Sequence, residues 1–372
     1  MNNRIFILNM EISGVNKYLF SQLKKRGWEL TIIDVPIPKI CLLLALFHSF
    51  TPHIFQWEKK FKRKISELAR LPWVFKLRSK FCQKKIKKFG RKTDVILQIS
   101  GMFAPTLDYK NFNIPFVTLN DYTMVLANKY IDFSTPQSQM KQWLKLEKDV
   151  YKNAKFIFAT SDNTRKSFIN DYGMESKKVI TVRYGVTLNY SPKSRKDYDT
   201  NTILFIGKNF KRKGGFVLLE AFKKVREEIN DAELIIAGVQ KDVLKIGQSG
   251  VNALGYVDNK TINKLYEKAS VFVMPSLCEP FGLVFLEAMG HKLPCIGTTI
   301  DAMPEIIEDG ITGFLVPPNN AEQLSKKIIT LLRNPALCAS MGSEGFKQLN
   351  KNISWNDFGE KIDYYLKQCL IN

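Results

Sequence analysis

The sequence lacks an apolar run long enough to cross a membrane. Its longest such run, Ile40 to Phe47, falls far short of the ~20 residues that a membrane-spanning helix requires. The first residues also lack the apolar stretch and the small-residue cleavage site of a secretory signal peptide. We therefore expect a cytoplasmic protein without a membrane-spanning helix.

Cysteine and histidine are scarce and scattered. None of the six cysteines forms a Cys-x-x-Cys pair, so we expect reduced thiols that mostly fill the core. These are Cys41, Cys82, Cys278, Cys295, Cys338 and Cys369. Only three histidines are present, His48, His53 and His291, and we expect each to have a structural role.

Acidic residues are few relative to basic ones, at 35 against 56, and the formal net charge is +21. Much of the excess lies in residues 58–92, which hold fifteen Lys or Arg and two Glu. Aromatic and aliphatic residues alternate there with the cations, a pattern typical of helices on an anionic membrane surface. Ordinary helices with solvated lysine faces are the alternative. Nucleic acid is not an expected partner, because no nucleic-acid-binding motif accompanies the charge.

The chain is long enough for two domains, since 372 residues with 45% hydrophobic content exceed one typical domain. Both halves alternate strand-like runs with helical segments, the βαβ pattern of a parallel sheet. The strand-like runs are residues 5–8, 29–34, 94–99, 116–119, 156–160 and 179–186, then 202–206, 233–237, 251–254, 271–274, 294–297 and 313–316. The polar stretch 187–200 is the expected linker and hinge. Two such halves predict a ligand cleft at the carboxyl ends of the strands.

The most informative segment is SLCEPFGLVFLEAM at residues 276–289, which places Glu279 and Glu287 eight residues apart. Together with the apolar run before it, this segment predicts a strand, a loop that holds Glu279, and a helix whose first turn is residues 281–283. The first amides of a helix are unpaired donors at a positive dipole end and suit a diphosphate. A carboxylate beside them can accept hydrogen bonds from sugar hydroxyls. The segment therefore predicts a nucleotide-sugar site.

Two other loops follow strands and could complete this site. Residues 207–215, GKNFKRKGG, supply four cations and flexible glycines, which can hold a diphosphate and neutralise charge on a departing nucleotide. A solvated basic turn is the alternative for that loop. Residues 255–258, GYVD, could border a nucleotide base with backbone groups.

With these motifs the chain resembles the retaining glycosyltransferases of family 4. The resemblance rests on the E-x7-E motif of Glu279 and Glu287 and on residues 304–316, PEIIEDGITGFLV, which are similar to the family's PEII-DG-GFLV stretch. Residues 207–214 are similar to its GR-x4-KG loop, 184–186 to its NGVD junction, and 354–355 to the SW pair before its final helix. The resemblance covers residues 150–372 well and the first 150 in outline.

The resemblance implies an α/β fold of the GT-B type, with two Rossmann-like domains that face each other across a cleft. The expected domains are residues 1–190, which would bind the acceptor and carry the basic insert 58–92, and residues 191–352, which would bind the nucleotide sugar. Residues 353–372 would form a C-terminal helix that crosses back to the first domain.

The resemblance also implies catalytic roles by position. Glu279 would lie near the donor sugar, and Lys213 would stabilise the leaving diphosphate with help from Arg212. Asn120 and Asp121 stand in the place of the family's His-Asp pair. The histidine is therefore missing, and Asp121 is the catalytic candidate of the first domain.

The same comparison implies a set of donor-binding residues. Phe281, Gly282 and Leu283 would offer main-chain amides to the diphosphate, and Glu287 would bind the ribose hydroxyls. Val257 would touch the base through its backbone. Lys208 stands at the position of a family arginine, a substitution that keeps the charge and loses the bidentate geometry.

Three further positions depart from the family pattern. His291 stands where relatives have a small residue, and Lys292 replaces a glycine after the motif helix. Asp301 and Ala302 replace the usual Gly-Gly before the PEII stretch.

The function implied is a retaining glycosyltransferase that moves a hexose-type sugar from a nucleoside-diphosphate sugar, with UDP or GDP as the expected nucleotide. The acceptor would be a glycan or a lipid-linked molecule in cell-surface polysaccharide or glycolipid synthesis. No cofactor or metal ion is expected, because the cations would replace a metal and no Asp-x-Asp motif stands out as a donor site. We expect the protein in the cytoplasm, on the inner face of the membrane through residues 58–92.

Two alternatives remain open at this point. A nucleotide-sugar epimerase of the same fold would need acid and base groups on both sides of the sugar, and the histidine-poor first half argues against it. A non-catalytic module that binds anionic lipid or glycan would use the basic insert alone.

Overall fold

The computed structural model describes residues 3–10, 14–51, 54–90, 92–130, 136–186, 196–239 and 247–371. The chain divides into two compact domains, the first made of residues 1–183 and 358–372 and the second of residues 184–357. Most of the predicted linker, residues 187–195, lies outside the described residues. The first domain thus ends at 183 instead of the expected 190, and the second at 357 instead of 352.

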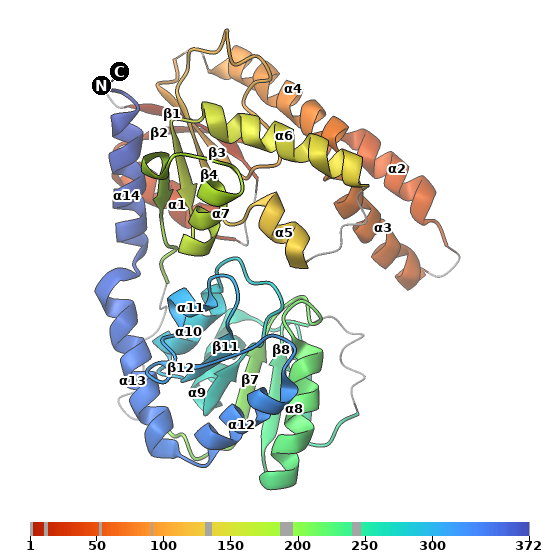
Figure 1. Cartoon of the computed structure of the whole chain (residues 1–372), viewed down its shortest axis with the longest axis vertical. Coiled ribbons are helices and arrows are strands. Elements are labelled where there is room, and N and C mark those ends of the chain that lie inside the picture. Colours follow the sequence, from red (N-terminus) through yellow and green to blue (C-terminus); the bar gives the residue numbers. More distant parts are fainter. Residues whose placement is uncertain are drawn as a thin grey trace. The chain divides into compact units, whose positions relative to one another are not determined.

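The first domain is built on a parallel six-stranded sheet in the order β2-β1-β3-β4-β5-β6 (Figure 1). Its strands are β1 (Arg4–Asn9), β2 (Glu29–Asp34), β3 (Val95–Ile99), β4 (Phe116–Asn120), β5 (Phe156–Ala159) and β6 (Val179–Thr181). Strands β3 and β4 are buried along their whole length, which explains their continuous apolar character. The prediction of a strand over 179–186 is wrong in length, because β6 ends at Thr181.

The main core of this domain lies between one face of the sheet and the helices α4 (Pro72–Phe89), α6 (Gln137–Asn153) and α7 (Asp162–Asn170). From α4 the core receives Phe75, Cys82 and Ile86, and the Phe75 ring meets the Trp143 ring edge-on at 5.3 Å. Much of the basic segment 58–92 is therefore an integral layer of the fold.

Two other helices, α2 (Lys39–Ser49) and α3 (Ile54–Leu68), form a smaller core with the start of α4. The buried members of this cluster are Cys41, Ala45, Leu68 and Val74. A shorter helix, α5 (Met124–Tyr130), follows β4.

The opposite face of the sheet is covered by α1 (Asn16–Lys25) and the C-terminal helix α14 (Trp355–Gln368) (Figure 1). The Tyr365 ring lies against Phe156 and Phe158, with centroid distances of 4.9 and 6.1 Å. The indole N–H of Trp28 donates a hydrogen bond of 2.7 Å to Asp363. The last helix of the chain thus belongs to the first domain, as expected.

The second domain has its own parallel six-stranded sheet, in the order β12-β11-β10-β7-β8-β9. Its strands are β7 (Thr202–Ile206), β8 (Glu233–Ala237), β9 (Val251–Gly255), β10 (Val271–Val273), β11 (Cys295–Thr298) and β12 (Gly313–Val316). The helices between and after them are α8 (Gly215–Glu228), α9 (Asn259–Lys268), α10 (Leu283–Gly290), α11 (Met303–Ile306), α12 (Ala321–Leu332) and α13 (Pro335–Asn352). The α/β prediction with two Rossmann-like sheets is confirmed.

A helix must be long and apolar to cross a membrane. Among the helices that the structure describes, none combines the length and the apolar character that a membrane span needs.

A buried carboxyl group joins α6 to the turn that follows α7 in the first domain. Glu147 accepts hydrogen bonds from the hydroxyl groups of Tyr151 and Tyr172, at 2.6 and 2.5 Å. Burial raises the pKa of Glu147 to about 7, although both tyrosine hydrogen bonds oppose the rise. A side chain on Gly101 would collide with this group, since its Cβ would lie 2.3 Å from the Tyr151 hydroxyl oxygen.

Glu147 should make the stability of the first domain depend on pH. The folded protein keeps the Glu147 proton up to about pH 7, whereas the unfolded chain releases it near pH 4.5, so stability should decrease as pH rises between these values. Relative to Glu147→Gln, the wild type should lose about 3 kcal/mol over this range. Denaturant unfolding followed by tryptophan fluorescence measures it, because four of the five tryptophans lie in this domain.

The exposed Glu58→Gln is the matched control and should leave the pH dependence as in the wild type. Parallel pH profiles for the wild type and Glu147→Gln would contradict the assignment.

Candidate functional site

Three loops of the second domain meet at the carboxyl edge of its sheet. Strands β7, β10 and β11 are neighbours and run parallel, so the loops that follow them, at 207–214, 274–282 and 299–302, emerge at the same edge. Two of these loops are joined directly, because the Leu277 N–H donates to the Arg212 carbonyl oxygen at 2.8 Å. The cationic loop and the glutamate motif of the sequence are therefore brought together.

Two glycines allow this close approach. Gly214 precedes α8 with φ of 73°, and a Cβ there would lie 1.8 Å from the Pro275 carbonyl oxygen. Gly282 precedes α10 with φ of 92°, in the left-handed region that favours glycine. Both helices thus begin at the shared edge, with their first main-chain amides there.

An ion pair between Lys213 and Glu279 lies where these loops meet. Their side chains are only 13% and 7% exposed, so both charges are largely removed from water. Burial lowers the pKa of Lys213, and Arg212 lowers it further, while Glu279 favours the charged form. Ser276 Oγ lies 3.4 Å from the same Glu279 oxygen. The arrangement holds one cation and one carboxylate in fixed positions beside a helix start.

Asp301 fixes the main chain of Glu279. Its carboxylate accepts a hydrogen bond of 2.8 Å from the Glu279 N–H, and its own φ of 53° is left-handed. On the other side, the Arg212 guanidinium donates to the Cys278 carbonyl oxygen. Sequence reasoning noted Asp301 only as a departure from Gly-Gly and missed this role, because residues 22 positions apart meet only in the fold.

Glu287 lies one turn further along α10, half-buried. Its carboxylate accepts a hydrogen bond of 3.0 Å from the Tyr266 hydroxyl. Burial raises the pKa of Glu287, and this hydrogen bond opposes the rise. The His291 ring stacks on Tyr266 at 4.8 Å, and burial lowers the pKa of His291 to about 3. His291 is therefore a neutral packing partner of Tyr266, which in turn contacts Glu287.

The remaining donor-binding candidates differ in exposure. Phe281 is buried, and its ring meets that of Tyr184 edge-on at 5.1 Å. The predicted first turn at 281–283 is placed two residues too early, because α10 begins at Leu283 and Gly282 precedes it in a left-handed conformation. Lys208 is exposed on the loop after β7, and Val257 is half-buried in the loop after β9. Their roles stay predictions.

The catalytic candidate of the first domain follows β4. The Asp121 main-chain carbonyl accepts a hydrogen bond of 3.0 Å from Thr164 Oγ1. Its neighbour Asn120 is buried and donates through Nδ2 to Thr118 Oγ1 at 3.1 Å. Of the other histidines, His48 lies on α2 and contacts the Leu44 carbonyl oxygen, and His53 falls outside the described residues. The role of Asp121 stays a prediction.

Within the described ranges, no three His, Cys, Asp or Glu side chains gather in a way that could hold a metal ion. Whether the reaction needs a metal stays a prediction.

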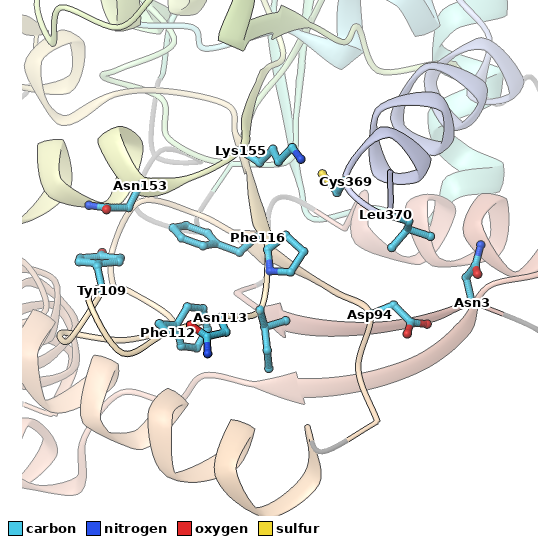
Figure 2. A pocket seen from close by; sticks show the side chains of 12 residues that line it. Asn3, Asp94, Tyr109, Phe112, Asn113, Phe116, Asn153, Lys155, Cys369 and Leu370 are labelled. Atoms are coloured by element: carbon cyan, nitrogen blue, oxygen red, sulfur yellow. The ribbon is translucent and has the colours of Figure 1, made fainter. Parts of the chain in front are cut away.

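A cavity of about 800 Å³ opens at the amino edge of the first domain's sheet, where its strands begin (Figure 2). Its lining includes Asp94, Phe116 and Lys155, which stand just before or at the starts of β3, β4 and β5. In a parallel sheet all these starts share the amino edge, so this cavity is separate from the carboxyl edge where sites of this fold form.

Comparison with known proteins assigns the family of the second domain. Residues 187–348 match the family model described as Glycosyl transferases group 1. The second domain belongs to this family. An uncharacterized glycosyltransferase of Methanocaldococcus jannaschii is 32% identical over 176 residues, which cover 45% of this chain and 45% of that protein.

A longer match extends the likeness beyond the group 1 domain. The O-antigen chain mannosyltransferase B of Escherichia coli is 25% identical over 355 residues, covering 84% of this chain and 87% of the relative. The chain spans about half the length of the first curated relatives it matches.

A solved structure confirms the fold class of the whole chain. The sucrose-phosphate synthase of Thermosynechococcus elongatus matches 99% of this chain and 99% of its own, with a TM-score of 0.73 and 18% identity. At that identity the likeness shows the fold alone, which is the GT-B type predicted for the group 1 family.

The contact between Asp301 and Glu279 can be tested by substitution. Asp301→Asn keeps an acceptor and tolerates the left-handed backbone, so turnover of a nucleotide-sugar donor should stay near wild type. Asp301→Ala removes the acceptor, and the loss of about 1 kcal/mol should lower turnover about fivefold.

Asn319→Ala is the matched control, because Asn319 also has a left-handed φ, of 58°, and stands outside the three loops. Equal losses in Asp301→Ala and Asn319→Ala would assign the effect to backbone strain and refute the positioning role.

Proposed function

We propose that this protein is a retaining glycosyltransferase that moves a hexose-type sugar from a nucleoside-diphosphate sugar, with UDP or GDP as the nucleotide. The acceptor would be a glycan or a lipid-linked molecule in the synthesis of cell-surface polysaccharide or glycolipid. The observation that carries the proposal is the buried Lys213–Glu279 pair at the start of α10, within a group 1 domain.

The proposed chemistry is mainly stabilisation of charge. As the bond between the sugar and the diphosphate breaks, negative charge grows on the diphosphate and positive charge on the sugar. Lys213, Arg212 and the amides of Phe281, Gly282 and Leu283 suit the anion, because fixed donors in a dry site act more strongly than in water. The leaving phosphate can accept the proton of the acceptor hydroxyl on the same face of the sugar, so configuration is retained. These cations would take the place of a metal ion.

The ion pair suggests how a donor would enter this site. Without ligand, Lys213 is neutralised by Glu279. A bound diphosphate supplies a second anion for Lys213, which leaves the Glu279 carboxylate able to accept hydrogen bonds from the sugar hydroxyls. Asp301 holds the Glu279 main chain in place during this exchange.

The nucleotide end of the donor would be read by groups further along the same edge. Glu287 accepts from the Tyr266 hydroxyl through one oxygen, Oε2. We propose that this carboxylate accepts hydrogen bonds from the ribose hydroxyls, while the Val257 backbone borders the base and Lys208 adds positive charge. Asp121 is the proposed contribution of the first domain to catalysis.

The Lys213–Glu279 pair gives the principal test of the activity. Lys213→Ala should lower turnover of the nucleotide-sugar donor about 10²–10³-fold, because it removes charge stabilisation of the leaving group. Glu279→Gln keeps the side-chain volume and should lower turnover while nucleotide binding changes less. The donor is first chosen by the increase in melting temperature that each candidate produces.

Lys268→Ala is the matched control, since Lys268 forms an exposed ion pair with Glu233 and should leave turnover within about twofold. Unchanged turnover in Lys213→Ala would favour a non-catalytic module. The anomeric configuration of the first product, read by proton NMR, tests retention, and release of an epimerised nucleotide sugar would favour the epimerase.

We further propose that the partner surface of the first domain is an anionic membrane, which places the protein at the cytoplasmic face. Support comes from α4, which carries six Lys and no Asp or Glu, while its one arginine, Arg78, is buried. Deleting residues 58–92 is not a usable test, because Phe75, Cys82 and Ile86 belong to the domain core. Substitution of exposed side chains is required instead.

A further inference from the structure

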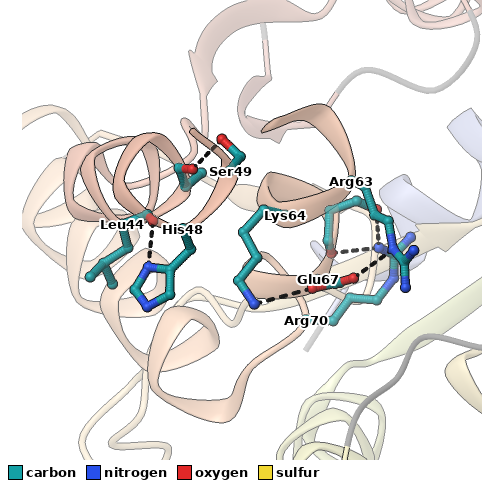
Figure 3. A network of polar contacts seen from close by, with 9 residues as sticks. Leu44, His48, Ser49, Arg63, Lys64, Glu67 and Arg70 are labelled. Carbon is teal, nitrogen blue, oxygen red and sulfur yellow. Dashed lines mark hydrogen bonds and ion pairs between the residues drawn. The ribbon is translucent and has the colours of Figure 1, made fainter. Parts of the chain in front are cut away.

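Helix α2 buries its small residues and exposes its large apolar ones. Cys41, Ala45 and Ser49 recur every four residues and face the small core shared with α3 and α4. The Ser49 hydroxyl donates to the Ala45 carbonyl oxygen at 2.6 Å, so the buried stripe has no unpaired hydroxyl (Figure 3). These three residues form a narrow stripe. They are the fully buried side chains through which α2 packs on its own domain.

The outward side of the helix is apolar except for the exposed Lys39 in its first turn. Phe47 is 82% exposed, Phe50 directly after the helix is 78% exposed, and Leu43 is 55% exposed. The other exposed apolar residues of this segment are Ile37, Ile40, Leu42 and Leu46. On the helix these positions cover roughly 160° of the circumference at 100° per residue. Scattered exposed apolar residues need no explanation, but a continuous face of this kind marks a binding surface.

Positive charge adjoins this apolar face. Helix α4 packs Val74 into the same cluster as Cys41 and Ala45, so its first turns lie against α2. Lys76, Lys80 and Lys84 are exposed along one side of α4, and none has an ion-pair partner among the residues described. Trp73 and Leu77 are exposed on that side as well.

The cations of α3 are less available. Arg63 and Lys64 both pair with Glu67 (Figure 3). Lys62 pairs with Glu58. Helix α4, which has no acidic residue, therefore carries more unneutralised positive charge than α3, while the apolar surface is concentrated on α2.

We propose that α2 inserts its apolar face into the boundary between headgroups and acyl chains of an anionic bilayer, with the α4 lysines on the headgroups. This inference rests on the proposed function, because a lipid-linked acceptor would be presented at that boundary. An interfacial helix buries its apolar face while nearby Lys and Arg contact anionic lipid, and α2 with α4 supplies both parts.

Charge favours a lipid surface over a second copy of this chain as the occupant. At a net charge of +21, two copies would bring their unneutralised lysines together, which opposes self-association. An anionic bilayer is complementary to the lysines and to the apolar face at once.

Vesicle binding of the full chain tests the proposal. Vesicles of phosphatidylglycerol mixed with phosphatidylcholine should bind the wild type, and vesicles of phosphatidylcholine alone should bind it far less. The double variant Leu43→Ser and Phe47→Ser should weaken binding to the anionic vesicles at least about tenfold, because two exposed apolar side chains no longer leave water. The matched control, Ile311→Ser with Tyr364→Ser, changes two exposed apolar residues elsewhere and should bind as the wild type.

Insertion depth is read from a single probe. Phe47→Trp should give a blue-shifted emission component with anionic vesicles, and lipids brominated on the acyl chains should quench it. Tyr364→Trp should show neither effect.

Nucleotide-sugar binding without vesicles separates this inference from the proposed function. The Leu43→Ser and Phe47→Ser variant should bind donor as the wild type, so loss of vesicle binding alone supports the role of α2. Failure of the wild type to bind any nucleotide sugar would refute the proposed function and leave the vesicle result standing. Unchanged vesicle binding of the double variant, or concentration-dependent dimers that disappear in this variant without any vesicle binding, would overturn the inference.

Discussion

The buried pairing of Lys213 with Glu279 is the interaction on which the proposed site depends. A buried charge without a partner is strongly unfavourable, so removing either residue leaves the other uncompensated. The pair exists only because Gly214 lets one loop approach Pro275 and because Arg212 and Leu277 join the two loops through the main chain. The backbone contacts between the two loops thus determine where the charges of Lys213 and Glu279 lie.

Much of the fold could be predicted because parallel strands buried on both faces are continuous apolar runs. The predicted strands at 202–206, 233–237 and 313–316 coincide with the largely buried β7, β8 and β12. The run at 179–186 was predicted too long, since apolarity past Thr181 has another cause: Tyr184 packs its ring against Phe281 and Trp355. Periodicity cannot distinguish these two reasons for burial.

The candidate site was predictable where one short segment carries the chemistry, as in the two loops with Lys213 and Glu279. Contacts between distant segments were not. Asp301 has no local signature that announces its bond to the Glu279 amide, and Glu147 gains its raised pKa only through burial beside Tyr151 and Tyr172. The charge of residues 58–92 was visible, but their division into a core-facing α4 and a paired α3 required the fold.

The bond between Trp28 and Asp363 has a consequence for how the protein is made. It joins the second strand region of the chain to the last helix, and the whole second domain is synthesised between them. On a ribosome the first domain can assemble most of its sheet early, but one face stays only partly covered, by α1, until α14 has emerged. The second domain, made of one continuous stretch, can fold before the first is complete. The order of completion is therefore the reverse of the order of synthesis.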